Sequence, residues 1–340
     1  MNAPLRIGIA GIGRMGQRHA MNLAHRTLGA QLVAACSPIA SELEWARDKL
    51  NVTHLYGDYK DFLARPELDA VFLVTPTTLH ADQIIQALQA GKHVFSEKPL
   101  ALNIPDCLRV EQEAAKHPKQ KVMIGFVRRF DPSYREAHDK VRAGLIGRPF
   151  LVRSQTADQN DPSGFFVRFA PTSGGAMLDM SVHDIDVARW FLGAGGGKRV
   201  YAAGTIAIHK GLAESGDVDN GVAICEFGDG QIACFYASRT MAHGHETLSE
   251  IIGTQGRLMV GQNPRIDRIE ISDAHGVRNE CTPTFYERFA DAFRLEAQAF
   301  VDTVLGDLPL PLTLRDATEA TRIGIALTQS LRSGRAVDID

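Results

Sequence analysis

Several features that mark specialised classes of protein are scarce in this sequence of 340 residues. It has five cysteines and no C-x-x-C pair, so we expect neither a disulfide framework nor a zinc site, and we expect the reducing cytoplasm. Its longest apolar runs, such as residues 70–74, are far too short to cross a membrane. The apolar N-terminal run is interrupted by glycines, so we expect no export signal.

The sequence also lacks an excess of charge of either sign. Its 37 basic and 40 acidic residues give a net charge of −3, without a long run of like charge. Because nucleic-acid-binding domains carry clustered basic residues, we expect no nucleic-acid partner. A hydrophobic content of 44% is typical of soluble globular proteins, and the length is enough for about two domains of roughly 150 residues each.

Short apolar runs alternate with helical patterns through the first 124 residues. Runs rich in Val, Ile, Leu and Phe are typical of strands buried on both faces. Because strand–helix–strand crossovers are right-handed, the alternation predicts a doubly wound parallel sheet, and thus an α/β domain, at residues 1–124. The predicted strands are 5–10, 31–36, 69–75, 93–96 and 121–125, and the predicted helices are 15–25, 41–50, 79–90 and 105–116.

The pattern changes in residues 125–340, where we expect an α+β domain with a large, mainly antiparallel sheet. Gly228-Asp229-Gly230 between two alternating runs predicts a hairpin. Glycines and prolines predict a loop at 158–175. The predicted helices are 133–143, 176–192, 285–304 and 314–332, and the predicted strands are 149–156, 222–227, 231–238, 249–253, 257–260 and 268–271.

A glycine-rich segment, Gly11-Ile12-Gly13-Arg14-Met15-Gly16, follows the first predicted strand and opens the first helix. In a dinucleotide site the first glycine permits a tight turn, the second lets the backbone approach a pyrophosphate, and the third lets the helix pack closely. Unpaired N–H groups at the helix start attract the anion. An ordinary glycine-rich turn is the alternative, but the position between strand and helix favours a dinucleotide.

The acid that commonly binds the ribose hydroxyls is missing from the end of the second predicted strand. Ser37 stands there instead, and apart from Arg14 no basic residue is at hand for a 2′-phosphate. We therefore expect NAD as the cofactor, with NADP left open.

Glu97-Lys98-Pro99 follows the predicted strand 93–96, at the sheet edge where ligands bind. Such a segment places a cation beside a bound dinucleotide, and a solvated turn is the alternative reading.

Asp179 and His183 are four residues apart in the predicted helix 176–192 and would share one face. An imidazole beside a carboxylate can accept a proton at neutral pH. The alternative is a helix start whose acids, Asp184 and Asp186 among them, favour the helix dipole, with His183 at the surface.

Taken together, these elements resemble the glucose-fructose oxidoreductase / inositol dehydrogenase (Gfo/Idh/MocA) family over nearly the whole chain. Within it they are most similar to inositol dehydrogenases, including those acting on scyllo-inositol. The resemblance implies a Rossmann-type sheet and the NAD-dependent oxidation of a ring hydroxyl of myo- or scyllo-inositol to the ketone. It is carried by the glycine segment and by residues 75–80, 97–99, 125–132 and 179–186.

The resemblance also implies roles for individual residues. Lys98 and His183 would contact the reacting hydroxyl, and Asp179 would bind the substrate or orient the pair. Further substrate contacts would come from Asp158, Asn160 and His245. The implied cofactor contacts are Gly11, Gly13, Arg14, Met15, Ser37, Thr75, Pro76, His80, Glu97, Lys98 and Arg128.

Some details depart from the family pattern or stay open. Many inositol dehydrogenases carry Tyr-Asp where this chain has His245-Glu246, so the preferred stereoisomer is left open. The peptide bond before Pro99 is a candidate for the cis form. We expect no metal, because His243-Gly244-His245 lacks an evident third ligand.

Other functions are compatible with the same motifs. The scaffold could oxidise an aldose at its anomeric carbon, assist glycoside cleavage by transient oxidation, or serve as a non-catalytic dinucleotide sensor. The set of Lys98, Asp179 and His183 argues against a sensor, which needs no proton relay. The predicted second sheet would expose Val222, Ile224, Ile232 and Cys234, so we expect a homo-oligomer, a dimer or a tetramer.

Overall fold

The computed structural model describes residues 3–262 and 265–339. The chain divides into two compact units, Met1–Val127 with Asp291–Thr318, and Arg128–Ala290 with Glu319–Asp340. The expected second domain included residues 291–318, which here join the first unit. The reason is helix α11 (Ala290–Leu305), whose Phe300 packs edge-on against Phe72 and Phe95 of the first sheet.

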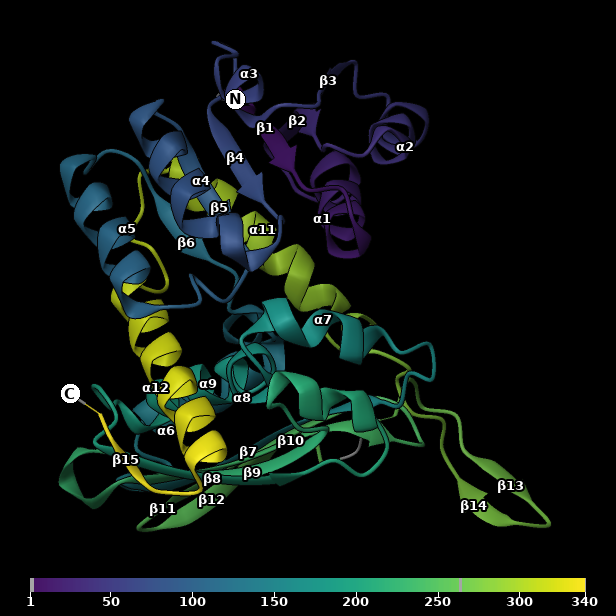
Figure 1. Cartoon of the computed structure of the whole chain (residues 1–340), viewed down its shortest axis with the longest axis vertical. Helices are drawn as coiled ribbons and strands as arrows, with labels where there is room; N and C mark the ends of the chain where they lie inside the picture. Colours follow the sequence, from purple (N-terminus) through teal and green to yellow (C-terminus); the bar gives the residue numbers. More distant parts are fainter. Residues whose placement is uncertain (1–2, 263–264, 340) are drawn as a thin grey trace. The chain divides into compact units, whose positions relative to one another are not determined.

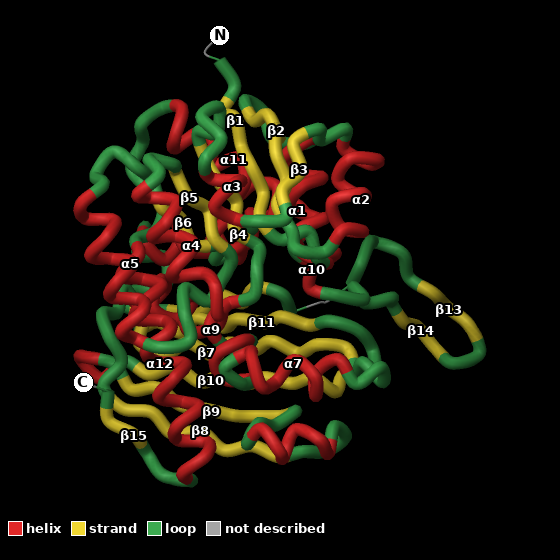
Figure 2. The backbone as a smooth tube through the Cα atoms, turned by 45° about the horizontal axis from the view of Figure 1, so that its top comes forward, coloured by secondary structure: helices red, strands yellow, loops and turns green. Residues whose placement is uncertain are grey.

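The first unit contains a six-stranded sheet with the order β3-β2-β1-β4-β5-β6, in which every neighbouring pair is parallel (Figure 2). This confirms the doubly wound parallel sheet and adds one short strand, β3, that the sequence pattern did not reveal. The strands are β1 (Leu5–Ala10), β2 (Ala30–Cys36), β3 (His54–Tyr56), β4 (Ala70–Leu73), β5 (His93–Ser96) and β6 (Val122–Ile124).

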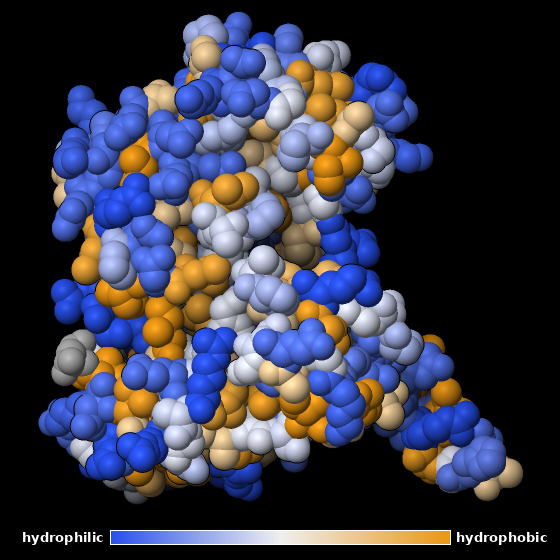
Figure 3. All heavy atoms as spheres, viewed as in Figure 1, coloured by the Kyte–Doolittle hydropathy of each residue, from blue (hydrophilic) through white to orange (hydrophobic). Residues whose placement is uncertain are grey.

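The strand order places helices on both faces of this sheet. From β1 the chain adds β2 and β3 on one side, and from β4 it adds β5 and β6 on the other side. Because the crossovers are right-handed, this reversal puts α1 and α2 on one face of the sheet and α4 and α5 on the other (Figure 1). The residues over α3 and α5 are mostly hydrophilic (Figure 3). The helices are α1 (Arg14–His25), α2 (Ala40–Leu50), α3 (Tyr59–Leu63), α4 (Thr77–Gln89) and α5 (Ile104–Lys116).

The second unit contains a seven-stranded sheet with the order β12-β11-β7-β10-β9-β8-β15. Only β10 and β7 pair in parallel among its described strands, so the expected mainly antiparallel sheet is confirmed. A separate hairpin of β13 (Ile271–Asp273) and β14 (Gly276–Arg278) projects from this unit (Figure 1). The sheet strands are β7 (Pro149–Gln159), β8 (Arg199–Thr205), β9 (Asn220–Glu226), β10 (Ile232–Met241), β11 (Glu246–Gly253), β12 (Gly256–Val260) and β15 (Val337–Asp338).

Side chains alternate along the strands of this sheet. On β9, Val222 and Ile224 are exposed while Ala223 and Cys225 are buried. The expected apolar face is therefore present on this chain, and it includes the exposed Tyr201 and Ile232. Among the described residues, no helix combines the length and the apolar character needed to cross a membrane.

Three expectations for the second unit were wrong in detail. The predicted loop 158–175 contains helix α7, which starts after Gly164 and ends at Gly174, both at positive φ. The predicted helix 176–192 is two helices, and the predicted helix 285–304 is interrupted at Phe289. The helices are α6 (Pro132–Arg142), α7 (Phe165–Ser173), α8 (Ala176–Asp179), α9 (Val182–Leu192), α10 (Phe285–Arg288), α11, and α12 (Leu314–Ser333), which begins in the first unit.

Candidate active site

The glycine loop, Gly11–Gly16, is closely packed at its first and third glycines and open at the second. A Cβ atom on Gly11 would lie 2.4 Å from the carbonyl oxygen of Val74, and one on Gly16 would lie 1.9 Å from that of Gly11. For Gly13 the nearest described atom would be Glu42 Oε1, at 3.7 Å. A ligand can therefore approach the backbone at Gly13.

The loop leads directly into the N-terminus of α1. Gly13 is the N-cap residue and has no side chain to accept hydrogen bonds from the first N–H groups. The first turn, which includes Arg14 and Met15, carries no acidic residue. Unsatisfied donors and the positive end of the helix dipole make this an anion site suited to a pyrophosphate.

A carboxylate from another element lies beside Ser37. Ser37, buried at the end of β2, donates a 2.5 Å hydrogen bond to Glu42 Oε2 in the first turn of α2. The other oxygen of Glu42 faces Gly13. A carboxylate thus reaches the position that Ser37 left without one. The only signal in the sequence was an acid five residues beyond Ser37.

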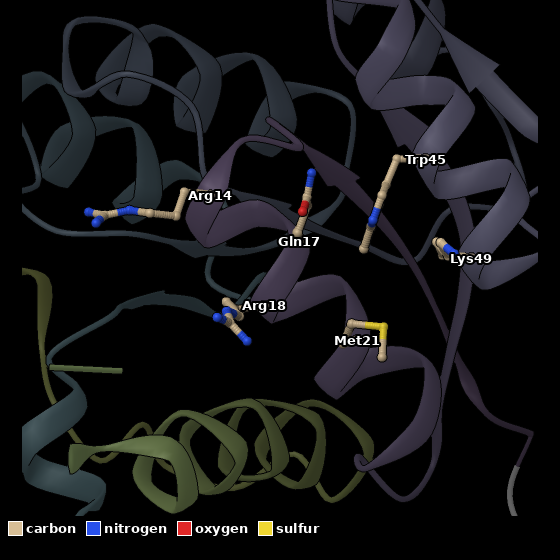
Figure 4. Close-up of a pocket in the computed structure, with 6 residues that line it drawn as sticks. All are labelled: Arg14, Gln17, Arg18, Met21, Trp45 and Lys49. Carbon is tan, nitrogen blue, oxygen red and sulfur yellow. The ribbon is translucent and has the colours of Figure 1, made fainter. Parts of the chain in front are cut away.

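A cavity of about 490 Å³ is lined by side chains of α1 and α2. Trp45 and Lys49 come from α2, and the remaining lining residues come from α1 (Figure 4). Arg14, the first residue of α1, belongs both to the glycine loop and to this cavity, and its side chain extends away from Trp45 (Figure 4). Cations at this place add to the positive potential near the loop. The lining residues are Arg14, Gln17, Arg18, Met21, Trp45 and Lys49.

Lys98 follows β5 at the carboxyl edge of the sheet, and its bond to Pro99 is cis. Glu97 beside it is held from two sides. Its Oε1 lies 2.8 Å from His19 Nε2, and its Oε2 accepts a 3.1 Å hydrogen bond from the backbone N–H of Lys98. The carboxylate of Glu97, an implied cofactor contact, therefore also fixes the backbone at Lys98.

His80 is buried, and both of its ring nitrogens lie 2.9 Å from backbone carbonyl oxygens, those of Pro99 and Thr75. Burial lowers the pKa of His80, and the contacts with the two carbonyl oxygens oppose this shift. The His80 ring therefore ties the segment after β4, which also contains Pro76, to the segment after β5. These contacts are structural, and the implied contact of His80 with the cofactor stays a prediction.

In the second unit, Asp179 ends α8 and His183 lies in the first turn of α9. The two helices are joined by a wide turn, in which the N–H of Ser181 donates to the carbonyl of Ala176, five residues back, at 3.4 Å. Asp179 forms an ion pair of 3.2 Å with the buried Arg239 of β10. The prediction that Asp179 and His183 share one continuous helix is therefore wrong, and no sequence pattern indicates that Arg239 holds Asp179.

Arg128 and Asp184 form a buried ion pair of 2.6 Å. Although burial opposes its charge, Asp184 raises the pKa of Arg128 above its ordinary value. Arg129 pairs in the same way with Asp186, at 2.6 Å. The reading of these two acids as helix-dipole decoration was wrong, because both are buried beside cations. The guanidinium of Arg128 already contacts Asp184 and Thr156, which argues against its implied contact with the cofactor.

The three implied substrate residues of the second unit lie near the end of β7 and the start of β11. The buried His245 places Nδ1 2.9 Å from Asp158 Oδ1. Asn160 donates its backbone N–H to the carbonyl of Met241. His245 Nε2 and Asn160 Oδ1 are buried without a hydrogen-bond partner among the described residues. Hydroxyl groups of a ligand can satisfy such atoms.

Comparisons with known proteins agree with this geometry. Residues 5–126 match the family described as "Oxidoreductase family, NAD-binding Rossmann fold", and residues 134–259 match the "GFO/IDH/MocA C-terminal domain". The chain is 36% identical to scyllo-inositol 2-dehydrogenase (NAD(+)) of Bacillus subtilis, over 100% of this chain and 98% of that protein. It is 31% identical to myo-inositol 2-dehydrogenase of Thermotoga maritima, with 99% of each chain covered.

A solved structure is similarly close. The crystal structure of scyllo-inositol dehydrogenase from Lactobacillus casei with bound NAD(H) and scyllo-inositol superimposes with a TM-score of 0.95. The two sequences are 39% identical, and the match covers 98% of this chain and 99% of that chain. The chain therefore belongs to the GFO/IDH/MocA family of oxidoreductases.

Proposed function

We propose that this protein oxidises a secondary ring hydroxyl of myo- or scyllo-inositol to the ketone, with NAD as the cofactor. The observation that carries the proposal is the glycine loop, open at Gly13 and followed by the uncapped start of α1. It is a site for a dinucleotide in a chain whose relatives bear the names of inositol dehydrogenases.

The residues present suit the cofactor. The glycine loop would bind the pyrophosphate through backbone N–H groups, and Glu42 with Ser37 would bind the hydroxyls of the adenosine ribose. A ribose 2′-phosphate would meet the carboxylate of Glu42, which favours NAD over NADP. When bound, NAD supplies the acceptor for the hydride that leaves the carbinol carbon.

The protein's own residues handle the proton of the reacting hydroxyl. In this proposal His183 accepts it as a general base, which is typically worth about 10²–10⁴ in rate. The ammonium group of Lys98 stabilises the negative charge that develops on the oxygen. Asp179 assists the pair, and its ion pair with Arg239 restricts its orientation.

Substrate recognition falls to Asp158, Asn160 and His245. His245 Nε2 and Asn160 Oδ1 are both buried and both lack a hydrogen-bond partner among the described residues, so they are suited to the hydroxyls of a cyclitol. Many inositol dehydrogenases carry Tyr where this chain has His245. In this proposal the His245 side chain therefore influences which inositol stereoisomer the enzyme prefers.

An assay of reduced nicotinamide formation with myo-inositol, scyllo-inositol and glucose, each with NAD and NADP, tests the proposal. We expect turnover on at least one inositol and a preference for NAD. Turnover on glucose alone would favour oxidation at the anomeric carbon, and dinucleotide binding without turnover on any polyol or sugar would favour a sensor.

We also propose a cytoplasmic homo-oligomer, a dimer or a tetramer. The five cysteines are free, which is compatible with a reducing compartment. The exposed apolar face of the second sheet, with Tyr201, Val222 and Ile224, would be covered by a second copy. Light scattering of the purified protein tests the assembly.

A further inference from the structure

A buried carboxyl group that the proposed reaction does not use lies in the second unit. It belongs to Asp217, which stands between a short 3₁₀ helix, η2 (Lys210–Ser215), and strand β9. No motif of the sequence includes this residue. The two oxygens of its carboxylate contact different groups, and both contacts lead to Asp179.

The first contact is with the start of α8, the helix that ends at Asp179. Asp217 Oδ1 accepts a 2.9 Å hydrogen bond from the backbone N–H of Ala176, the first residue of α8. The N-cap residue Gly175 has no side chain that could accept this bond. A side-chain oxygen that accepts from the first N–H groups stabilises a helix. Asp217 therefore caps α8, although it lies 41 residues further along the chain.

The second contact is with Arg239, which also holds Asp179. Asp217 Oδ2 lies 3.5 Å from Arg239 Nη1, an ion pair without a hydrogen bond. The other terminal nitrogen, Arg239 Nη2, donates a 3.2 Å hydrogen bond to Asp179 Oδ2. Arg239 thus bridges the two carboxylates, one from each side of its guanidinium. We call Asp179, Asp217 and Arg239 the Arg239 triad.

The triad is enclosed except at Asp179. Arg239 and Asp217 are buried, and the ring of Phe166 in α7 covers the guanidinium, with Cζ 5.0 Å from the ring centroid. A buried guanidinium needs a counter-charge, because removing it from water is costly. Two carboxylates and one guanidinium give the triad a formal charge of −1. Because Asp217 is the enclosed acid, it balances Arg239, and the excess negative charge lies at Asp179, whose side chain is 21% exposed.

Another buried acid, Asp219, lies two residues beyond Asp217 but is engaged elsewhere. Its carboxylate oxygens accept hydrogen bonds from the backbone N–H groups of residues 207–209. Towards Arg239 it offers its main-chain carbonyl, which accepts the backbone N–H of Arg239 at 2.8 Å. Asp219 is therefore a matched control for Asp217: a buried acid of the same segment whose carboxylate holds backbone and not the guanidinium.

We propose that Asp217 is a positioning residue for Asp179: it caps α8 and balances the charge of Arg239, so that Asp179 is held in place and keeps a negative charge for the reacting groups. The proposal rests on the proposed function, in which His183 becomes positively charged as it accepts the proton. A fixed negative charge at Asp179 stabilises that cation. Without Asp217, the guanidinium of Arg239 would have Asp179 as its counter-ion and would cancel this charge.

Three variants separate the two contacts of Asp217. Asp217→Asn keeps the shape and an oxygen that can cap α8 but removes the charge, whereas Asp217→Ala removes both, and Asp219→Asn is the control. We expect Asp217→Asn to lower kcat about tenfold, with the Kd for NAD within about twofold of wild type and a smaller change in the KM for inositol. Asp217→Ala should also lower Tm. Asp219→Asn should keep kcat within about twofold of wild type.

A double-mutant cycle with Arg239→Met tests whether Asp217 acts through the guanidinium. Once Arg239 has lost its charge, Asp217 has nothing to balance. Asp217→Asn should therefore change kcat less than about twofold in the Arg239→Met protein, against about tenfold in wild type. A purely structural role of Asp217 predicts the same loss in both backgrounds, because independent effects multiply.

Crystal structures of the variants without cofactor or substrate give a readout that does not depend on turnover. In Asp217→Asn the guanidinium should move towards Asp179, so that the distance from Arg239 Nη2 to Asp179 Oδ2 falls below 3.2 Å, while the hydrogen bond to the N–H of Ala176 remains. In Asp219→Asn the contact between Arg239 and Asp179 should match wild type.

The failure of this proposal and that of the proposed function are distinguishable. A wild-type protein that oxidises no polyol sinks the proposed function, and the crystal structures then judge whether Asp217 controls the contact of Asp179 with Arg239. Wild-type kcat in Asp217→Asn, an equal loss of kcat in both backgrounds of the cycle, or an unchanged contact between Arg239 and Asp179 in Asp217→Asn would each overturn the positioning role.

Discussion

Alanine substitutions at two positions of the glycine loop should have opposite consequences. Gly13 has φ −69° and ψ −166°, which alanine adopts readily, and its Cβ would lie no closer than 3.7 Å to a described atom. The folded protein should therefore tolerate Gly13→Ala, with a change in stability within about 0.5 kcal/mol. Gly16→Ala is different, because its Cβ would lie 1.9 Å from the carbonyl oxygen of Gly11.

The expected magnitudes follow from these distances. Gly16→Ala forces α1 and the loop apart, and overpacking of this kind costs about 1–3 kcal/mol or more. In Gly13→Ala the added methyl group fills the approach to the backbone N–H groups. Losing two charge-assisted hydrogen bonds of about 1.5–3 kcal/mol each would weaken NAD binding by about 10²–10⁴.

Thermal unfolding without cofactor and calorimetric titration with NAD measure the two effects separately. Gly13→Ala should keep the wild-type Tm and lose NAD affinity, whereas Gly16→Ala should lose several degrees of Tm as well. If Gly13→Ala bound NAD with the wild-type Kd, the loop would not be the pyrophosphate site, whatever its packing.

Other substitutions test individual side chains. Lys98→Met should retain NAD affinity while kcat falls by orders of magnitude, and near wild-type turnover would contradict its role. His183→Ala should remove the acidic limb of the kcat/KM profile against pH, and an unchanged limb would exclude it as the base. Glu42→Gln should shift the ratio of kcat/KM for NAD over NADP by about tenfold towards NADP, and a constant ratio would show that Glu42 does not face the ribose. Asp184→Asn leaves the buried guanidinium of Arg128 without its counter-ion and should cost about 3–5 kcal/mol in chemical denaturation; a smaller loss would mean that water reaches the pair.

The parts of the fold that depend on local patterns were predictable from the sequence. The parallel sheet and the glycine loop follow from apolar runs, helical patterns and glycine spacing, all of which act within a few residues. Strand β3 was missed because its three residues, one exposed and two half-buried, carry no such pattern. Helix α7 was missed because Gly164, Pro171 and Gly174 are typical of a loop, although here the two glycines flank the helix and the proline lies inside it.

The supporting contacts of the candidate site could not be predicted in this way. Arg239 holds Asp179 across 60 residues, and His19 holds Glu97 across 78. Such pairs arise only when the fold brings distant strands and helices together, and a single buried Arg or Glu has no local signature. The sequence motifs name the groups that would meet the substrate, whereas long-range contacts determine their charge and orientation. For this reason the orientation of Asp179 depends on an arginine in β10 that no motif identifies.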